Sequence, residues 1–319
     1  MTDRAVELTN LDRVVFPDDG FTKGDVVEHY ERVAELALPH LADRPLVLQR
    51  FPQGIGGEGF YQKNTPDHVP DWIRRVELRT TDGGSTTYSV VDEPAGLVYL
   101  ANQGTITFHT LLAGAAAPDR PVELIVDLDP DTASGDVSAA VPTVQHAARE
   151  VRAVLDDLGL APRVKSSGSR GLHIVVDVVD ENPTFRLTRT FARRVAELVA
   201  TRGPFTLEHR TSKREGRLFL DVLRNGPANH AVAPYSLRPL PGAPVAIPLD
   251  WDEALSARFH PQRITLSNLP RRLAQKDDPW AGRPRPATTI AAALDTLDDT
   301  PDDILDDTTD GTLDDTLDG

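Results

Sequence analysis

Two short runs of the sequence place aspartates on apolar segments that have the character of β-strands. The run IVDLDP at residues 125–130 carries Asp127 and Asp129 two positions apart. Because alternate side chains of a strand share a face, these carboxylates would project together, about 7 Å apart along the strand. A bare Asp-x-Asp is at least as often a strand that ends in solvated acids. The segment 218–223 changes that balance, because it carries Asp221 among apolar neighbours, where a charge is costly unless it is paired or metal-bound. The three acids predict a site for two divalent cations, Mn²⁺ or Mg²⁺.

A second run, SSGSRGLH at residues 166–173, is typical of a phosphate-binding turn between two strands. Its two glycines let the backbone turn sharply and present N–H groups to an anion, and the side chains of Ser167 and Arg170 can add contacts. His173 would begin the next strand and point into the same site. Ser-Gly turns are common and a lone histidine is more often structural, so the value of this run is its position between the two acidic strands.

Further basic and aromatic side chains could complete such a site. Arg238, in the run APYSLR, offers a planar fork suited to a polyphosphate, although a surface arginine is more often simply solvated. Each candidate in the first third of the chain is likewise more often an ordinary core or surface residue than a binding residue. These candidates are Asn10, Arg13 and Lys23 for a phosphate, Arg50 at a strand end, Phe60, Tyr61 and Lys63 for base stacking, and His109 at the end of strand 105–109.

The elements that must position these residues follow from hydrophobic periodicity. An amphipathic helix is predicted over 23–38 with Thr22 as its N-cap, followed by short strands over 45–51, 87–91, 97–101 and 105–109. The second half reads as strand, helix, hairpin, helix and strand. Those elements are expected over 122–127, 139–158, 162–166 with 172–178, 184–201 and 218–223, and a short final helix near 265–275. This order predicts an α+β fold with helices on one face of a mostly antiparallel sheet.

Composition and charge bound the class of protein. The 319 residues include no cysteine, so disulfides, thiolate metal sites and cysteine nucleophiles are excluded. No apolar run reaches the ~20 residues of a membrane span, and the N-terminus lacks the features of a secretory signal, so a cytoplasmic location is expected. The net charge is −15, of which residues 281–319 contribute −9. We therefore expect residues 1–280 to form the folded domain and the Leu-Asp-Asp-rich tail 281–319 to be disordered.

Together, four ordered motifs resemble the polymerase domain of bacterial and archaeal DNA ligase D, a branch of the archaeo-eukaryotic primase superfamily. They are the DLDP at 127–130, the SGSRGLH at 167–173, the apolar strand with Asp221, and the PYSLR at 234–238. The resemblance runs from the LTNLDR at residues 8–13 to about residue 275. It implies a primase-polymerase fold, with a catalytic half like an RNA-recognition motif and an accessory α/β half packed against it.

The resemblance also implies roles for individual residues. Asp127, Asp129 and Asp221 would hold two ions, usually manganese, for nucleotidyl transfer onto a primer 3'-hydroxyl. Members of this family favour ribonucleotides, fill short gaps and add untemplated nucleotides at broken ends in non-homologous end joining. The implied nucleotide contacts are Ser167, Arg170, His173, Arg238 and His109, with Arg50 beside them. The implied DNA contacts are Asn10, Arg13 and Lys23 on a downstream 5'-phosphate, and Phe60 and Tyr61 with Lys63 on template bases.

Some features depart from the family pattern or leave alternatives open. Arg13 and Arg170 stand where many relatives have lysine, and no ligase or nuclease domain is attached, so a separate DNA ligase and Ku are expected as partners. A manganese-dependent glycosyltransferase that uses a nucleotide sugar would explain the DLDP motif but not the strand with Asp221. A non-catalytic module that binds DNA ends would not need the three acids.

Overall fold

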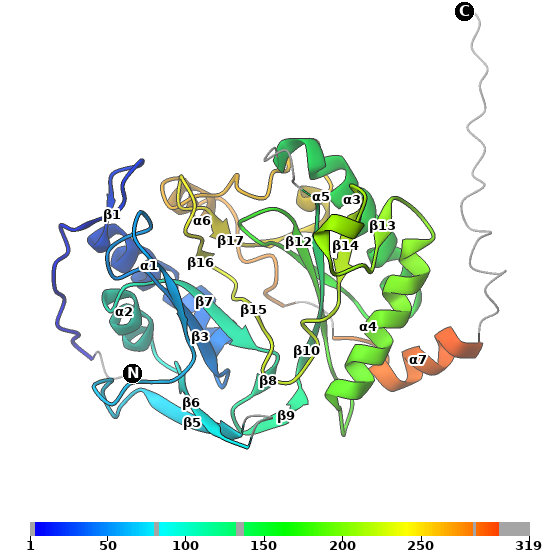
Figure 1. Cartoon of the computed structure of the whole chain (residues 1–319), viewed down its shortest axis with the longest axis horizontal. Coiled ribbons are helices and arrows are strands. Elements are labelled where there is room, and N and C mark those ends of the chain that lie inside the picture. Colours follow the sequence, from blue (N-terminus) through cyan, green and yellow to red (C-terminus); the bar gives the residue numbers. More distant parts are fainter. Residues whose placement is uncertain (1–3, 80–82, 132–136, 283–284, 300–319) are drawn as a thin grey trace, which may run out of the picture.

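The computed structural model describes residues 4–79, 83–131, 137–282 and 285–299. Two β-sheets form the middle of the molecule, with helices packed on the outer side of each (Figure 1). One half contains the N-terminal helices, and the other contains the two long helices that follow the DLDP motif. The predicted α+β class is confirmed by this arrangement.

The larger sheet contains six of the described strands, in the order β13-β14-β10-β12-β11-β18. All neighbours are antiparallel except β13 and β14, which run parallel. The two long helices, α3 (Val137–Asp157) and α4 (Phe185–Ala200), contact it. The strands in sheet order are Phe205–Thr206, Leu218–Asp221, Glu123–Asp129, Leu172–Asp177, Arg163–Ser166 and Pro248–Leu249.

Residue alternation gives this sheet one apolar and one polar face. Along β10, Leu124, Val126 and Leu128 are fully buried and join the main hydrophobic core, which includes the inner faces of α3 and α4. The intervening Asp127 and Asp129 must therefore point to the opposite face, since successive side chains of a strand alternate. Burial of the leucines and valine under the helices is what orients the two carboxylates.

The smaller sheet carries the N-terminal half. Its described strands run in the order β15 (His230–Val232), β7 (Thr105–Leu111), β3 (Leu46–Arg50) and β4 (Phe60–Gln62), all antiparallel. Helix α1 (Lys23–Leu41) contacts α2 (Pro94–Asn102), and α2 contacts β7. Short two-stranded ribbons complete this half, formed by Val14–Phe16 with Phe21–Thr22, Arg74–Arg79 with Ser85–Val90, Ala113–Gly114 with Ala117–Pro121, and Ser236–Leu237 with Val245–Ala246.

The two halves are joined at several points into a single structure. The chain leaves the larger sheet after β14 and enters the smaller one at β15, and the buried Lys165 of β11 donates from Nζ to the carbonyl of Val232 in β15 at 2.8 Å. Arg44 bridges in the other direction, to the carboxylate of Glu123 at 2.8 Å. The polar face of β10 therefore looks onto a seam between the sheets.

Helix α1 begins where the sequence indicated. The Thr22 side chain accepts from the backbone N–H of Asp25, and the Asp25 carboxylate accepts from the backbone N–H of Thr22, which completes a capping box.

The strand expected over 97–101 is wrong, because these residues lie in α2. A short apolar run is ambiguous between strand and helix, and here Pro94 in the first turn and packing on α1 decide for helix. The final helix is shorter than expected, with α6 covering Leu269–Leu273 after the four-residue α5 (Trp251–Ala254).

The disorder expected for residues 281–319 is wrong for Ile290–Asp299, which form helix α7. Ile290, Ala293 and Leu297 are buried, and α7 packs on α4 (Figure 1). The carboxylate of Asp180 accepts from the backbone N–H groups of Ile290 and Ala291, which caps the helix. Three buried apolar positions on one side of the segment are enough to stabilise a helix there, although the tail as a whole is acidic. The Leu-Asp-Asp repeats that begin at 305 and 313 lie outside the described residues.

Nothing in the described part of the chain combines the length and apolar character that a membrane-crossing helix requires.

A buried histidine gives the fold a predictable dependence on pH. His29 on α1 is 2% exposed and its Nε2 lies 2.9 Å from the carbonyl oxygen of Tyr235, to which it donates. Burial lowers its pKa to about 4, so between about pH 4 and its unfolded value of about 6.5 the unfolded chain binds more protons. Stability is therefore lost as the pH falls through this window.

We expect this histidine to contribute a slope of about 1.4 kcal/mol per pH unit to the free energy of unfolding below about pH 6. Urea unfolding near pH 7 and near pH 5 measures this slope. When the wild type unfolds in this pH range, His29 binds a proton, and His29→Gln should abolish that proton uptake and so reduce the slope. The exposed His68 gives the matched control, and His68→Gln should leave the slope unchanged. An unchanged slope in His29→Gln would contradict the assignment.

Candidate functional site

A row of four polar side chains crosses the larger sheet on its polar face. Cα pairing places Lys165 opposite His173, His173 opposite Asp127, and Asp127 opposite Asp221. Directly opposed residues of neighbouring strands project to the same side. The strand alternation that hides the apolar residues of β10, β12 and β14 therefore brings these four residues together.

Asp127 is 7% exposed and is held by two neighbours. Its Oδ2 accepts from Arg224 Nε at 2.6 Å, and its Oδ1 lies 3.4 Å from His173 Nε2. Burial opposes ionisation of this carboxyl, but the Arg224 guanidinium outweighs it and holds the pKa of Asp127 below its ordinary value. Burial and the Lys165 ammonium hold the pKa of His173 well below its ordinary value, so the ring beside Asp127 is neutral.

The other two acids are also within reach of arginines. Asp129 contacts Arg170 Nη2 at 2.7 Å and Arg214 Nη1 at 3.1 Å, and Asp221 lies 3.7 Å from Arg224 Nε. Burial and the neighbouring carboxylate of Asp127 raise the pKa of Asp221 above its ordinary value. The carboxylates are thus crowded enough to repel one another, and cations relieve that repulsion.

The loop at residues 166–171 is fixed by its own serines and glycines. The Ser167 hydroxyl oxygen accepts from the backbone N–H groups of Ser169 at 3.3 Å and Gly171 at 3.2 Å, and the Ser166 hydroxyl accepts from Gly168 at 3.0 Å. A Cβ on Gly171 would lie 1.9 Å from the carbonyl oxygen of Leu128, so only glycine lets the loop approach β10.

These bonds correct the expectation that the loop presents backbone N–H groups to an anion. The three amides named above are already bound to serine hydroxyls. Ser167 uses its oxygen as the acceptor, so its own hydroxyl hydrogen stays available to a ligand. Any phosphate contact from this loop would come from the side chains of Ser167 and Arg170.

Most of the predicted nucleotide residues line one cavity of about 140 Å³, which we call the acidic cavity. Arg238 reaches it from the segment after β16, and its buried Nε has no hydrogen-bond partner among the described residues. Burial lowers the pKa of this guanidinium, and the nearby Tyr61 and Asp127 offset that shift only in part. The predicted residues on its lining are Asp127, Asp129, Ser167, Arg170, His173, Arg238, His109 and Tyr61.

An aromatic cluster closes one side of the acidic cavity. The ring of His109 lies 4.9 Å from that of His230 in a T-shaped arrangement, and Tyr61 lies 5.5 Å from His109 and 5.8 Å from His230. Burial and the adjacent His230 lower the pKa of His109 well below its ordinary value, and burial lowers that of His230 to about 4. Neutral, polarisable rings beside charged groups suit a sugar or a base.

A second cavity, of about 250 Å³, lies in the N-terminal half, and we call it the basic cavity. It brings together Asn10, Arg13 and Lys23, as predicted for a phosphate. Lys23 is 8% exposed and donates to the carbonyl of Thr9, and burial and the nearby Arg13 lower its pKa. Because these two cations repel each other in a shared cavity, a bound anion would be stabilised there.

Arg50 does not join the nucleotide candidates, which corrects its assignment. It lines the basic cavity, and its guanidinium donates to the carbonyl of Gln103 and lies 5.6 Å from the centre of the Phe60 ring. Phe60 and Tyr61 are both exposed but, as adjacent strand residues, face opposite sides, so they form no single stacking platform. Tyr61 faces the acidic cavity, and Lys63 is an exposed residue just beyond β4.

Sequence reasoning missed two of the three arginines that pair with the acids. Arg224 lies three residues after Asp221, in a stretch that reads only as a turn, and Arg214 lies in a basic stretch at 211–214 whose alignment is not evident from sequence. The alternation of side chains along β11 could have indicated that Lys165 lies on the same face of the sheet as His173. Burial lowers the pKa of Lys165 to about 7, which makes it a weak cation behind His173.

Asn225 holds the end of β14 in place. Its side chain accepts from the N–H of Ile125 at 2.9 Å and donates to the carbonyls of Ile125 at 2.7 Å and Val222 at 2.9 Å. Strand pairing with β10 stops at Asp221, so this amide takes over the hydrogen bonds that a longer strand would make. The position of Asp221 opposite Asp127 therefore depends on Asn225.

We expect Asn225→Ala to lower the free energy of unfolding by about 2–3 kcal/mol, because it leaves buried backbone groups without partners. Chemical denaturation measures the change. Asn229→Ala removes an exposed amide with one bond, to Leu223, and should cost no more than about 1 kcal/mol. Equal losses in the two variants would show that Asn225 is no special support.

The sequence has relatives among proteins of non-homologous end joining. Residues 22–280 match the family described as LigD, primase-polymerase domain. The chain is 34% identical over 252 residues to the multifunctional non-homologous end joining protein LigD of Mycolicibacterium smegmatis, covering 78% of this chain and 32% of that protein. It is 30% identical over 277 residues to the bifunctional non-homologous end joining protein LigD of Bacillus subtilis, covering 86% of this chain and 43% of that protein.

A solved structure is similar over nearly its whole length. The polymerase domain from Mycobacterium tuberculosis ligase D, in complex with DNA, matches with a TM-score of 0.78 and 32% identity. The match covers 87% of this chain and 97% of that chain. The chain thus spans less than half of the two curated relatives but almost all of a polymerase domain.

Proposed function

Because the chain belongs to the LigD primase-polymerase family, we propose that it is a DNA-repair polymerase that adds nucleotides to DNA ends in non-homologous end joining. One observation carries the proposal beyond the family match. The acidic cavity is lined by Asp127 and Asp129 of β10 together with basic side chains, and Asp221 of the neighbouring strand β14 is paired directly opposite Asp127. A nucleoside triphosphate with its divalent cations needs both kinds of group.

Divalent metal dependence is implied by the family, and the donor set fits it. Carboxylate oxygens are the ligands that Mg²⁺ and Mn²⁺ prefer. Among the described residues no group of three His, Cys, Asp or Glu side chains is already arranged to hold an ion, and Arg224, Arg170 and Arg214 lie against carboxylate oxygens of Asp127 and Asp129. Burial and the neighbouring carboxylate of Asp127 raise the pKa of Asp221, and a bound cation would offset both effects.

We infer that Asp127, Asp129 and Asp221 would hold two ions, with manganese preferred. When bound, such ions make the primer 3'-hydroxyl easier to deprotonate and stabilise the departing pyrophosphate. The protein's own part is to position the reactants. Neutral His173 limits the orientations open to Asp127, and the Asn225 bridge keeps Asp221 opposite it.

The triphosphate would be held by the side chains that line the cavity opposite the acids. The unpartnered Nε of Arg238 and the hydroxyl of Ser167 are free to donate to phosphate oxygens. Arg170 is half-exposed and paired with Asp129, so it can exchange that carboxylate for a phosphate. The cluster of Tyr61, His109 and His230 would face the sugar or base.

The DNA end would occupy the basic cavity. Asn10, Arg13 and Lys23 would bind a downstream 5'-phosphate, with Arg50 beside them rather than at the nucleotide. Phe60, exposed on the same face as Arg50, would stack on template bases. Preference for ribonucleotides, and a DNA ligase and Ku as partners, form part of the proposal.

The proposal is tested by incubating the protein with MnCl₂, a gapped duplex that carries a 5'-phosphate, and each of four labelled ribonucleotides. Incorporation into the primer that EDTA abolishes supports it. Transfer from a labelled nucleotide sugar in place of incorporation would instead support the glycosyltransferase interpretation, against which the family match argues. End binding without any incorporation would support the non-catalytic module.

A further inference from the structure

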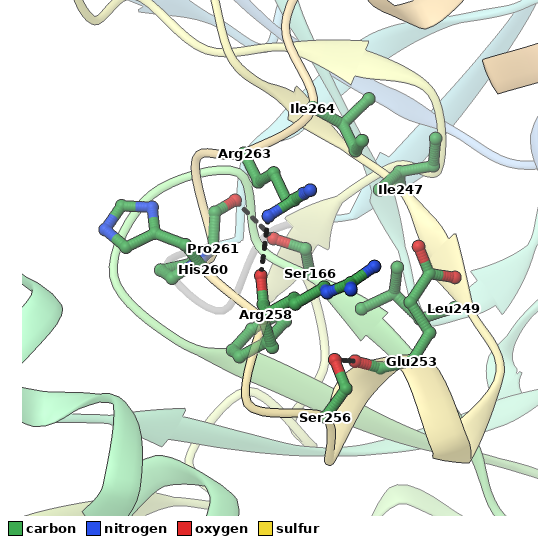
Figure 2. Close-up of a pocket in the computed structure, with 11 residues that line it drawn as sticks. Ser166, Ile247, Leu249, Glu253, Ser256, Arg258, His260, Pro261, Arg263 and Ile264 are labelled. Atoms are coloured by element: carbon green, nitrogen blue, oxygen red, sulfur yellow. Dashed lines mark hydrogen bonds between the residues drawn. The ribbon is translucent and has the colours of Figure 1, made fainter.

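A third cavity, of about 180 Å³, lies beside the loop that borders the acidic cavity (Figure 2). We call it the arginine cavity because Arg258 and Arg263 stand at its mouth. Its apolar wall includes Ile247, and Ser166 lies on the wall nearest the loop. Both guanidinium groups extend toward the interior, whereas His260 turns away (Figure 2).

The two arginines lack compensation by acids. Within the described residues neither Arg258 nor Arg263 pairs with a carboxylate, and the guanidinium of Arg263 donates to the backbone carbonyl of Arg258 at 3.0 Å. Glu253, the carboxylate on the cavity lining, is already bound by Arg272 and by Lys276. Two exposed guanidinium groups that face a common space without a counter-ion favour an anion.

The surrounding segment is basic in an acidic protein. Residues 258–272 contain four arginines and no acid, although the whole chain carries a net charge of −15. A second depression, lined by Arg263, Arg271 and Arg272, adjoins the arginine cavity and shares Glu253 with it. Arginines in a stretch without acids favour contact with an anion.

Hydrogen bonds connect the arginine cavity to the loop of the acidic cavity. Ser166 Oγ donates to the carbonyl of Pro261 at 2.6 Å, and Gln262 Nε2 donates to the carbonyl of Ser169 at 2.8 Å. Ser167 and Ser169 line the acidic cavity, so consecutive loop residues border the two cavities. A ligand that steadied residues 258–263 would also steady the loop.

We propose that the arginine cavity binds a phosphate group, supplied by the backbone of the DNA strand that the enzyme extends. Both guanidinium groups can donate charge-assisted hydrogen bonds to the oxygens of a single phosphate group. The planar fork of arginine suits phosphate oxygens. This inference rests on the proposed function for its choice of DNA as the polyanion, and the free pyrophosphate product is the other source of the same chemistry.

Fluorescence anisotropy with a labelled gapped duplex, without nucleotide and over a range of NaCl concentrations, tests the proposal. The Arg258→Ala/Arg263→Ala double variant should bind about tenfold more weakly, as expected for the loss of charge-assisted hydrogen bonds. The slope of log K against log salt should fall in magnitude by about 0.9 for one phosphate contact. The matched control, Arg186→Ala/Arg189→Ala, removes the same charge from exposed positions of α4 and should change neither quantity by as much.

A second arm separates the two sources of phosphate. Thermal unfolding is followed with and without sodium pyrophosphate for the wild type and both double variants. Unchanged DNA binding with lost stabilisation by pyrophosphate in Arg258→Ala/Arg263→Ala would overturn the DNA backbone as the source. Equal DNA affinity, salt slope and pyrophosphate response in all three proteins would overturn the site itself. Because wild-type nucleotide incorporation is measured separately, a failure of the proposed function is distinguishable from either result.

Discussion

Replacing Asp127 with asparagine is expected to lower the rate of nucleotide addition by about 10³-fold or more, equivalent to about 4 kcal/mol of transition-state stabilisation. Asparagine keeps the shape of the side chain but removes the negative charge that would hold cations between β10 and β14. The pKa of Asp127 is held below its ordinary value, so the carboxylate is ionised at neutral pH. Primer extension on a gapped, 5'-phosphorylated duplex measures the rate, and Asp129→Asn should behave alike.

Binding and folding should survive this change. The basic cavity, where the DNA end is proposed to sit, lies in the other half of the molecule, so duplex affinity should stay within a few-fold of the wild type. Asp156→Asn, which neutralises an exposed acid on α3, is the matched control and should extend normally. A folded Asp127→Asn variant that kept more than about a tenth of the activity would exclude the carboxylate from the chemistry.

The second large effect is expected at Arg238. Substitution by glutamine should raise the KM for the nucleotide about ten- to a hundredfold, because charge-assisted hydrogen bonds to phosphate contribute about 1.5–3 kcal/mol. The protein itself should be no less stable, since the Nε of Arg238 is buried without a hydrogen-bond partner among the described residues, and Tyr61 and Asp127 offset the burial of its charge only in part. Steady-state extension against nucleotide concentration, with thermal unfolding in parallel, measures both quantities.

Arg238→Lys distinguishes charge from geometry. It keeps the cation but loses the planar fork, so it should recover only part of the loss seen with glutamine. A marked drop in stability with an unchanged KM would show that Arg238 supports the fold and does not contact the nucleotide. An effect on kcat alone would place its contact in the transition state.

The orientation of site residues was predictable from the sequence where the alternation of side chains within one strand decides it. The apolar residues around Asp127 and Asp129 fix which way both carboxylates point, and burial of Leu128 in the core confirms it. The capping residue Thr22 likewise decides the start of α1 from neighbours only three residues away. The register of Asp221 opposite Asp127 is a longer-range result that only the structure supplies. The sequence predicted that the two acidic strands share one site, because each carries a charge that is costly among apolar neighbours unless it is paired or metal-bound.

Other features depended on packing between distant segments. Residues 97–101 have strand-like composition, and Pro94 in the first turn together with contact with α1 favours helix. Arg50 and Phe60 lie on one side of the small sheet and Tyr61 on the other, so the predicted grouping failed once the strand pairing was known. Helix α7 is stabilised by Asp180 and α4, neither of which is near it in sequence. The ion pairs of Arg224 and Arg214 arise in the same way, from loops that return to β10.

The most direct test of the role of the three acids is the binding of Mn²⁺ itself. Electron paramagnetic resonance of the free ion, recorded during titration of the protein in the presence of a non-hydrolysable nucleoside triphosphate, counts the ions bound. We predict two ions per chain in the wild type, and the loss of at least one of them in Asp127→Asn, while Asp156→Asn retains both. Equal manganese binding in the wild type and Asp127→Asn would contradict the proposal that Asp127, Asp129 and Asp221 hold the catalytic cations.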